Sequence, residues 1–297
     1  MSNPRWKLFV VLVVVLLALG VGAGQAHAQA PAAPNTCEDG EQESGAIYRI
    51  CMPAQWDGKR AVIYLHGYVA PTEPVGIPEE QVSLPGFPLT LDQVINLQGD
   101  AFVMSSYSTT GFAVDAAMAD SLDALGIFSG LYGEPQEVVL LGLSDGALAT
   151  TLLLERYPQI FRGGVGLCGP YDSLTEQTDY FGDFRVLFDY FFPEIEIANS
   201  PIDIAPATIA NWETIYSDTI QSVVSDPANA DRLAQLMATA STAFDPTDVA
   251  ASSENAVSRL LWYNVFATND AIAKLGGQPF DNSARTYSGS DDDDALN

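Results

Sequence analysis

Apolar residues recur along this chain in short runs separated by longer segments of helical spacing. The runs with the length and character of buried strands are 61–65, 101–105, 138–143 and 163–168. Segments that repeat apolar residues every three or four positions lie between them, at 91–97, 112–128 and 147–157. Buried strands that alternate with helices predict an α/β fold, with a mostly parallel sheet flanked by helices on both faces.

The remaining segments before residue 172 predict edges and loops. Residues 46–51 alternate enough for an edge strand, and 29–36 indicate a flexible arm rich in Ala and Pro. A turn that carries Trp56 follows, and the Pro- and Gly-rich stretch 71–88 predicts a long surface loop.

The pattern changes after residue 172, where aromatic clusters precede two Asp-Pro pairs. In Asp226-Pro227 and Asp245-Pro246, Asp can cap a helix and Pro can occupy its first turn. Helices are therefore expected over 228–242 and 254–266. We interpret 173–278 as a helical lid inserted over the sheet; the alternative is a helical extension that only buries sheet surface.

Aromatic residues of this region could line an acyl or aryl pocket, although a role in the lid core is favoured. They are Tyr180, Phe181, Phe188, Tyr190, Phe191, Phe192, Trp212, Trp262 and Tyr263. The chain then predicts a C-terminal core segment over 279–297, with a short strand at 286–288 and a solvated acidic tail that includes Asp291 to Asp294.

The length of 297 residues, with 47% hydrophobic and 10% aromatic content, is enough to fill a sizeable core.

Residues 1–28 resemble an export signal, because Arg5 and Lys7 precede an apolar run and Ala26-His27-Ala28 offers a cleavage site. We expect cleavage after Ala28 and a secreted or periplasmic protein without membrane contact; the alternative is a permanent N-terminal anchor. Removal of the leader would leave residues 29–172 as the first part of the α/β core.

The charge excludes one class of partner. The whole chain carries 12 basic and 38 acidic residues, and removal of the leader leaves 10 basic residues and a net charge of −28. A field of that sign repels polyanions, so nucleic acid is excluded as a partner and strongly acidic substrates are disfavoured.

Three cysteines have different expected roles. Cys37 and Cys51 could form a disulfide that clips the N-terminal arm to the first strand, because export permits such bonds. Cys168 ends an apolar run and is expected to be a buried free thiol. No metal site and no cofactor are expected.

The candidate chemistry lies at Gly142-Leu143-Ser144-Asp145-Gly146, between an apolar run and a helical segment. A strand, a sharp turn and a helix are predicted there. Gly142 and Gly146 relieve crowding in the turn, so that the Ser144 hydroxyl projects from it as in a nucleophile elbow. His66-Gly67-Tyr68 follows the predicted strand 61–65 in the same way.

With these two motifs, the chain resembles the α/β-hydrolase fold over about 46–172, in particular secreted bacterial serine esterases of the feruloyl-esterase and polyester-depolymerase kind. The resemblance implies that Ser144 is the nucleophile and that the backbone N–H groups of Tyr68 and Asp145 form the oxyanion hole. His66 would hold the loop behind that hole; the alternative is that His66 is the catalytic base. Loss of one oxyanion donor typically costs about 3 to 4 kcal/mol of transition-state stabilisation.

The sequence departs from this family in its missing base. Family members carry an acid and then a histidine after the nucleophile, whereas no histidine follows Ser144 here. Asp292 is a candidate acid in the acidic tail. We therefore expect a chain cut short at its C-terminal end, with the final strand or strands missing.

The function expected is that of a secreted serine hydrolase acting on small-molecule or polymer-derived carboxylic esters, inactive or incomplete as it stands. The alternatives are a non-catalytic protein that binds a ligand on the same fold, a serine peptidase, or an enzyme completed by a second chain that supplies the histidine.

Overall fold

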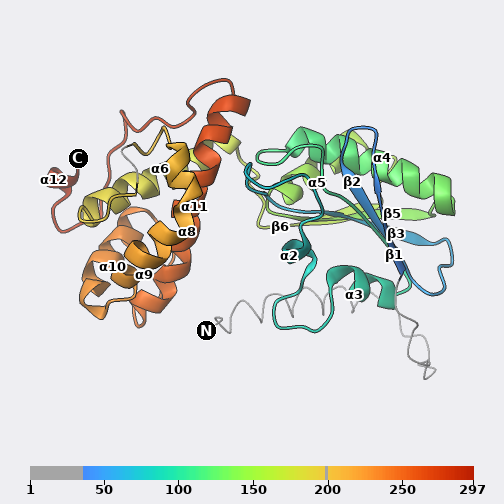
Figure 1. Ribbon diagram of the computed structural model, residues 1–297, viewed down its shortest axis with the longest axis horizontal. Helices are drawn as coiled ribbons and strands as arrows, with labels where there is room; N and C mark the ends of the chain where they lie inside the picture. Colours follow the sequence, from blue (N-terminus) through green and yellow to red (C-terminus); the bar gives the residue numbers. More distant parts are fainter. Residues whose placement is uncertain (1–35, 198–199) are drawn as a thin grey trace. The chain divides into compact units, whose positions relative to one another are not determined.

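The computed structural model describes residues 36–197 and 200–297, so the expected leader and its cleavage site lie outside the described residues. The chain divides into two compact units (Figure 1). The sheet unit comprises Met1–Val69 and Glu73–Gly169, and the helical unit comprises Ala70–Thr72 and Pro170–Asn297. Within the described residues, no helix has the length and apolar character needed to cross a bilayer.

The sheet unit is built on six strands in the order β1-β2-β4-β3-β5-β6. They are β1 (Thr36–Glu41), β2 (Ile47–Met52), β3 (Arg60–Leu65), β4 (Ala101–Ser105), β5 (Glu137–Leu143) and β6 (Gly163–Leu167). The strands β4, β3, β5 and β6 pair in parallel. The β1–β2 and β2–β4 pairs are antiparallel. The α/β class with a mostly parallel sheet is confirmed.

The strand at the antiparallel edge differs from the prediction. Residues 46–51 were expected at the edge, but β2 lies between β1 and β4. The edge strand is β1, whose TCEDGE sequence is almost fully exposed and offers no apolar alternation. Cys37 and Cys51 are directly opposed in the β1–β2 register and form a disulfide, which fastens this polar strand to the sheet.

Helices cover both faces of the sheet (Figure 1). They are α2 (Glu79–Val82), α3 (Leu91–Leu97), α4 (Val114–Tyr132) and α5 (Asp145–Arg156). The helices α4 and α5 lie on one face, and α2 and α3 lie on the other. Only one residue, Ser144, separates the end of β5 at Leu143 from the start of α5 at Asp145.

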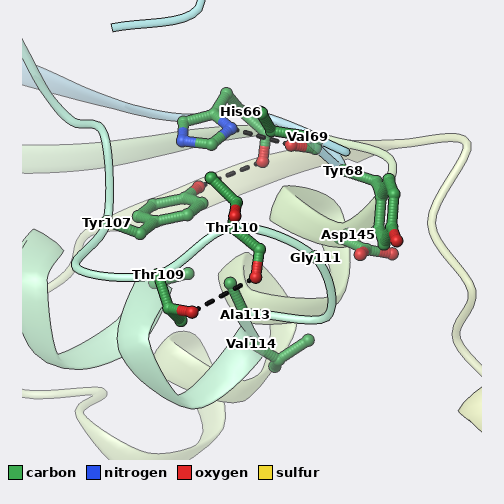
Figure 2. Close-up of a pocket in the computed structure, with 12 residues that line it drawn as sticks. His66, Tyr68, Val69, Tyr107, Thr109, Thr110, Gly111, Ala113, Val114 and Asp145 are labelled. Carbon is green, nitrogen blue, oxygen red and sulfur yellow. Dashed lines mark hydrogen bonds between the residues drawn. The ribbon is translucent and has the colours of Figure 1, made fainter. Parts of the chain in front are cut away.

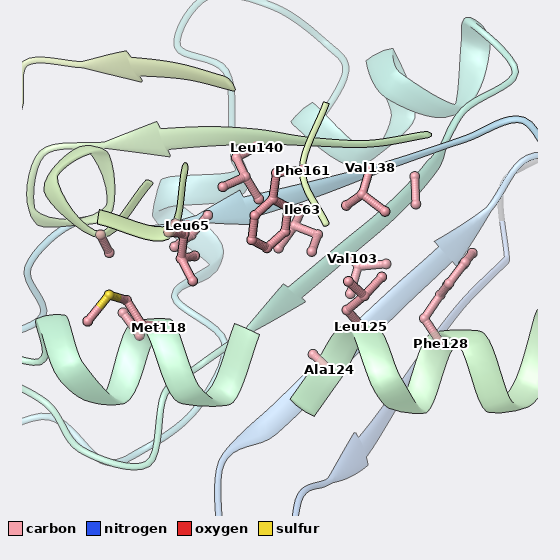
Figure 3. Packing of buried hydrophobic residues seen from close by; sticks show 14 of the residues in the cluster. Ile63, Leu65, Val103, Met118, Ala124, Leu125, Phe128, Val138, Leu140 and Phe161 are labelled. Carbon is pink, nitrogen blue, oxygen red and sulfur yellow. The ribbon is translucent and has the colours of Figure 1, made fainter. Parts of the chain in front are cut away.

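Alternation along β3 explains why two separate cores form. Ile63 and Leu65 point to the face of α4, where they pack with Phe128 and neighbouring apolar side chains (Figure 3). Val62 and Tyr64 point to the opposite face and pack beneath α2 and α3. Because a central parallel strand is buried on both sides, its sequence reads as a continuous apolar run.

The helical unit contains seven α-helices, a π-helical turn and a 3-10 turn among its described residues. They are α6 (Leu174–Phe191), α7 (Pro206–Ala210), α8 (Trp212–Ile215), η1 (Tyr216–Ile220), α9 (Gln221–Val224), η2 (Pro227–Asn229), α10 (Ala230–Thr239), α11 (Val249–Lys274) and α12 (Asp293–Leu296). The long helices α6 and α11 share an apolar core that contains Phe188, Leu233 and Leu261.

The helix starts expected at the two Asp-Pro pairs have different outcomes. Asp226 accepts a hydrogen bond from the Ala228 N–H at 2.9 Å and caps η2, which leads into α10. The second pair does not start a helix, because Asp245 instead accepts from the N–H and hydroxyl of Thr247 in a turn. Helix α11 begins three residues after Pro246, behind Asp248.

Most of the aromatic residues singled out above belong to the core of the helical unit. Phe188, Phe191, Phe192 and Trp212 are buried in one cluster, whereas Tyr180 and Tyr190 are exposed. Aromatic packing is thus the main role of this group in the structure.

The end of the chain packs on the helical unit. Residues 286–288 do not form the expected strand, because no strand follows β6 in the described part of the chain. Arg285 pairs with Asp179 at 2.6 Å and with Asp183 on α6, and Tyr287 donates to Asp183 at 2.7 Å. These contacts fix the segment before the acidic residues, which was expected to begin a core segment.

Candidate functional site

The residue between β5 and α5 has a strained backbone. Ser144 has φ 54° and ψ −123°, a combination that is unfavourable for a residue with a Cβ. Its N–H donates to the Leu167 carbonyl on β6 at 2.8 Å, and its own carbonyl accepts from the Ala147 N–H at 2.8 Å. The turn is therefore held from both sides, and the half-buried Ser144 projects from it.

Two glycines allow this turn to pack. A Cβ on Gly142 would overlap the Gly146 carbonyl and the Thr150 hydroxyl, and a Cβ on Gly146 would overlap the Leu65 carbonyl at the end of β3. The first turn of α5 therefore lies directly against the end of β3. This close approach brings the loop after β3 beside Ser144.

The loop of His66, Gly67 and Tyr68 lies in contact with the elbow. A Cβ on Gly67 would stand 3.0 Å from the Cβ of Ser144 and 3.2 Å from the Leu143 carbonyl, so glycine is the only residue that fits without displacement. The residues of the two sequence motifs are thus brought together at the carboxyl ends of β3 and β5.

His66 is buried within the sheet unit, with 2% of its surface exposed. Its Nδ1 lies 2.7 Å from the Gly67 carbonyl, and since a carbonyl can only accept, Nδ1 carries the proton. Burial lowers the pKa of His66 to about 4, although the hydrogen bond to Gly67 opposes the shift. With this low pKa the imidazole is a weak proton acceptor, and it is buried and held by the backbone, which favours the supporting role over that of a general base.

The His66–Gly67 hydrogen bond also orients the oxyanion loop. The carbonyl of Gly67 belongs to the same trans peptide as the N–H of Tyr68, so the two groups point in opposite directions. Because the carbonyl points to the imidazole, the Tyr68 N–H points away from it. His66 thereby determines the direction of one of the two expected oxyanion donors.

The ring of Tyr107 packs against the ring of His66 (Figure 2). The two rings stack with centroids 3.9 Å apart, and the Tyr107 hydroxyl donates to the His66 carbonyl at 3.0 Å. Tyr107 follows β4 with φ 60°, and its complete burial raises the pKa of its hydroxyl well above the ordinary value. It therefore acts here as a neutral hydrogen-bond donor.

A small cavity lies between this pair and the start of α5. His66, Tyr107 and Asp145 are among its lining residues (Figure 2), and its volume is about 10 Å³. A volume of that size is at the lower limit for one water molecule. The cavity is consequently part of the support behind the elbow and has no room for an acyl or aryl group.

Cys168 corrects the sequence prediction. It was expected to be buried, but it is exposed, and its thiol is not in a disulfide. The reason is its position directly after β6, with φ 57°, where the chain leaves the sheet. The preceding residue, Leu167, accepts the Ser144 N–H through its carbonyl. Cys168 therefore lies at the same end of the strands as Ser144.

The acid and histidine that the resemblance implies after Ser144 are not found among the described residues of the sheet unit. His66 is the one histidine among the described residues, and its Nδ1 is bonded to Gly67. Asp292, the candidate acid, belongs to the helical unit, where its carboxylate accepts from the Ala295 N–H at 3.0 Å.

Two further residues contribute to this site but were not identified from the sequence. Tyr107 could have been found, because it follows the strand 101–105 at the same edge as His66. Gln81 could not, because it lies in a Pro- and Gly-rich stretch without periodicity; its carboxamide contacts the loop of Gly67 and Tyr68.

No family profile matches the sequence, and no characterised protein matches it in a sequence comparison. Solved structures that match part of the chain include an acylaminoacyl peptidase of Pyrococcus horikoshii, at 16% identity and a TM-score of 0.36, covering 52% of this chain and 26% of that one.

Two esterases give similar values. An esterase of Pyrococcus furiosus shares 15% identity over 62% of this chain and 61% of its own, with a TM-score of 0.39. An arylesterase shares 16% identity over 59% of this chain and 57% of its own, with a TM-score of 0.34. The chain thus spans less than two thirds of the length of each of these proteins.

The fold and the site define a class of protein: an α/β fold in which a G-x-S-x-G elbow follows a central parallel strand and a His-Gly loop follows its neighbour. This is the arrangement described for α/β-hydrolase sheets.

Proposed function

We propose that this chain is a serine hydrolase of the α/β-hydrolase fold that forms an acyl-enzyme on Ser144 with carboxylic esters. The observation that carries the proposal is the strained φ of 54° at Ser144, between a buried strand and a helix start. Backbone strain of this kind concentrates at functional sites, and here it projects a hydroxyl beside a loop of oriented N–H groups.

The reaction would proceed in two steps. The Ser144 oxygen forms a bond to the ester carbonyl carbon, the N–H groups of Tyr68 and Asp145 stabilise the oxyanion, and the bond to the alkoxide leaving group breaks. The hydroxyl proton passes to a base and then to the leaving group. Water later hydrolyses the acyl-enzyme by the same route. Esters are favoured over peptides as substrates because an alkoxide leaves with less assistance than an amine.

The base is the part that the described residues do not provide beside Ser144. Burial lowers the pKa of His66 to about 4, which makes its imidazole a weak proton acceptor, and the ring is bonded through Nδ1 to Gly67. We propose that acylation by the chain alone is slow, that turnover is negligible, and that the base comes from a complementing chain. A non-catalytic ligand-binding protein is the second candidate, and the same lack of a base supports it.

Export is part of the proposal. The leader expected over residues 1–28 and the Cys37–Cys51 disulfide both favour an oxidising compartment outside the cytosol. The helical unit is proposed as a lid, with its aromatic core providing its own stability. A secreted or periplasmic esterase without nucleic-acid partners agrees with the strongly negative net charge.

The test is acylation of the full chain by p-nitrophenyl butyrate, followed by peptide mass spectrometry. We expect a butyryl group on Ser144 in the folded protein and none in Ser144→Ala or in urea-unfolded protein. Added imidazole should raise the rate above that of the protein-free blank, because it can accept the serine proton. Absence of the adduct both with and without imidazole would favour the ligand-binding alternative.

A further inference from the structure

The side chain of Gln81 contacts two consecutive residues of the loop beside Ser144. Its Oε1 accepts a hydrogen bond from the Gly67 N–H at 2.7 Å, and its Nε2 donates to the Tyr68 carbonyl at 3.2 Å. The carboxamide therefore uses both its acceptor and its donor on the backbone of the loop. One side chain thereby holds the two peptide groups that flank the Gly67–Tyr68 peptide.

The backbone of Gln81 is itself anchored to the sheet. Its carbonyl accepts from the Tyr64 hydroxyl on β3 at 2.9 Å, and its N–H donates to the Pro78 carbonyl at 2.9 Å. The next residue, Val82, is 1% exposed and packs in the same core cluster as Tyr64. The short helix α2 thus holds the carboxamide in place, although it lies within a long irregular segment.

Hydrogen bonds thus hold three successive peptide groups of this loop, 66–67, 67–68 and 68–69. The His66 carbonyl is bonded to Tyr107, the Gly67 N–H to Gln81, the Gly67 carbonyl to His66, and the Tyr68 carbonyl to Gln81. Since a trans peptide is planar, these four bonds together determine the direction of the Tyr68 N–H. His66 and Tyr107 act from one side of the loop, and Gln81 acts from the other.

The same carboxamide lies close to the nucleophile. A Cβ on Gly67 would stand 3.2 Å from the Gln81 Oε1 and 3.0 Å from the Ser144 Cβ, so both groups flank one residue without a side chain. Gln81 accepts the Gly67 N–H and thereby removes it from the set of donors that an oxyanion could use.

We infer that Gln81 is a positioning residue that holds the Gly67–Tyr68 loop so that the Tyr68 N–H is directed at the oxyanion formed on Ser144. The inference rests on the proposed function and adds to it a residue from outside both sequence motifs. Gln81 does not touch the substrate; it acts through the loop.

The experiment compares the full chain with two variants at this position. Gln81→Met keeps the length of the side chain but loses both hydrogen bonds, whereas Gln81→Glu keeps the acceptor for the Gly67 N–H and loses the donor. Gln98→Met is the matched control, because Gln98 is exposed at the C-terminal end of α3 and its Nε2 donates to the Val94 carbonyl of the same helix. Two readouts are used: deuterium exchange of the Gly67 amide and the rate of Ser144 butyrylation.

We expect Gln81→Met to speed exchange of the Gly67 amide and to slow butyrylation at least about tenfold, because small misplacements of oriented groups have large effects on rate. Gln81→Glu should keep the amide protected and lie between Gln81→Met and wild type in rate. Gln98→Met should match wild type in both. Equal thermal unfolding of all variants would separate positioning from a general loss of stability.

The outcomes distinguish this inference from the proposed function. If wild type and Gln81→Met butyrylate Ser144 equally fast, the inference is wrong while the hydrolase proposal stands. If wild type forms no adduct on Ser144, the hydrolase proposal fails and the positioning role fails with it. Unchanged exchange of the Gly67 amide in Gln81→Met overturns the inference whatever the rates are.

Discussion

The hydroxyl of Tyr107 donates to the backbone carbonyl of His66 at 3.0 Å while the two rings stack 3.9 Å apart. A residue after β4 therefore holds a residue after β3 both by a hydrogen bond and by ring contact. Both side chains are almost fully buried, so water cannot replace either interaction.

Replacing Tyr107 by Phe keeps the stacked ring and removes only the hydroxyl. The His66 carbonyl loses its donor in a buried place, so we expect the free energy of unfolding to fall by about 1 to 3 kcal/mol. Urea denaturation followed by circular dichroism measures it. Tyr132→Phe is the control, because the hydroxyl of Tyr132 bonds to exposed Glu38, and its loss should change stability by less than about 0.5 kcal/mol. Equal losses in both variants would contradict the role given to Tyr107.

Acid should destabilise the fold partly through His66. Its pKa is about 4 in the folded chain, and an unfolded histidine has a pKa of about 6.5, so the unfolded state binds the proton more readily. The contribution of His66 is fully present above pH 6.5 and is lost as the pH falls from about 6.5 to about 4, up to about 3 kcal/mol.

The measurement is urea denaturation of wild type and His66→Gln at a series of pH values. Carboxylates contribute to both curves, so the difference between the two isolates the imidazole. We expect that difference to change across the window from pH 6.5 to pH 4 and to be flat above it. A flat difference throughout would mean that His66 can be protonated without unfolding or displacement.

Gly146→Ala should be severely destabilising. The added methyl group would overlap the carbonyls of Leu65 and His66, which are backbone atoms and cannot rotate away. We expect a loss of about 3 kcal/mol, in the upper range for overpacked sites. Gly126→Ala is the matched control, because Gly126 is exposed in the middle of α4 with open space around it. That variant should gain about 0.5 to 1 kcal/mol from helix propensity.

The disulfide should contribute measurably to stability. It closes a loop of sequence separation 14, for which chain entropy predicts about 3 kcal/mol. The double variant Cys37→Ser/Cys51→Ser should lose about that amount in urea denaturation. Cys168→Ser provides the control, since an exposed thiol should matter by less than about 0.5 kcal/mol. In native wild type, a thiol reagent should label Cys168 alone among the three cysteines.

The elements that could be predicted from the sequence are those whose structure is determined by their own local residues. Strands such as β3 and β5 are continuous apolar runs, and Gly142-x-Ser144-x-Gly146 indicates its own turn chemistry. Strand β1 could not be found, because its polar residues are held by pairing and by a disulfide with a partner elsewhere in the chain.

The same distinction holds at the site. His66 and Gly67 follow a recognisable strand, whereas the place of Gln81 depends on the anchoring of α2 by Tyr64 and Val82, which only tertiary packing determines. Cys168 was misjudged for a related reason. Its apolar neighbours indicate burial, but the chain leaves the sheet at that residue.

The backbone at Ser144 has a consequence for what the fold gains from this residue. Glycine adopts φ 54° and ψ −123° without steric penalty, so Ser144→Gly should raise the free energy of unfolding by about 1 kcal/mol, while Ser144→Ala, which retains a Cβ, should not. If so, the serine is a residue that the sheet unit would be more stable without. Selection for stability alone would remove it, and its presence would then reflect a trade-off in which the hydroxyl serves a purpose other than folding.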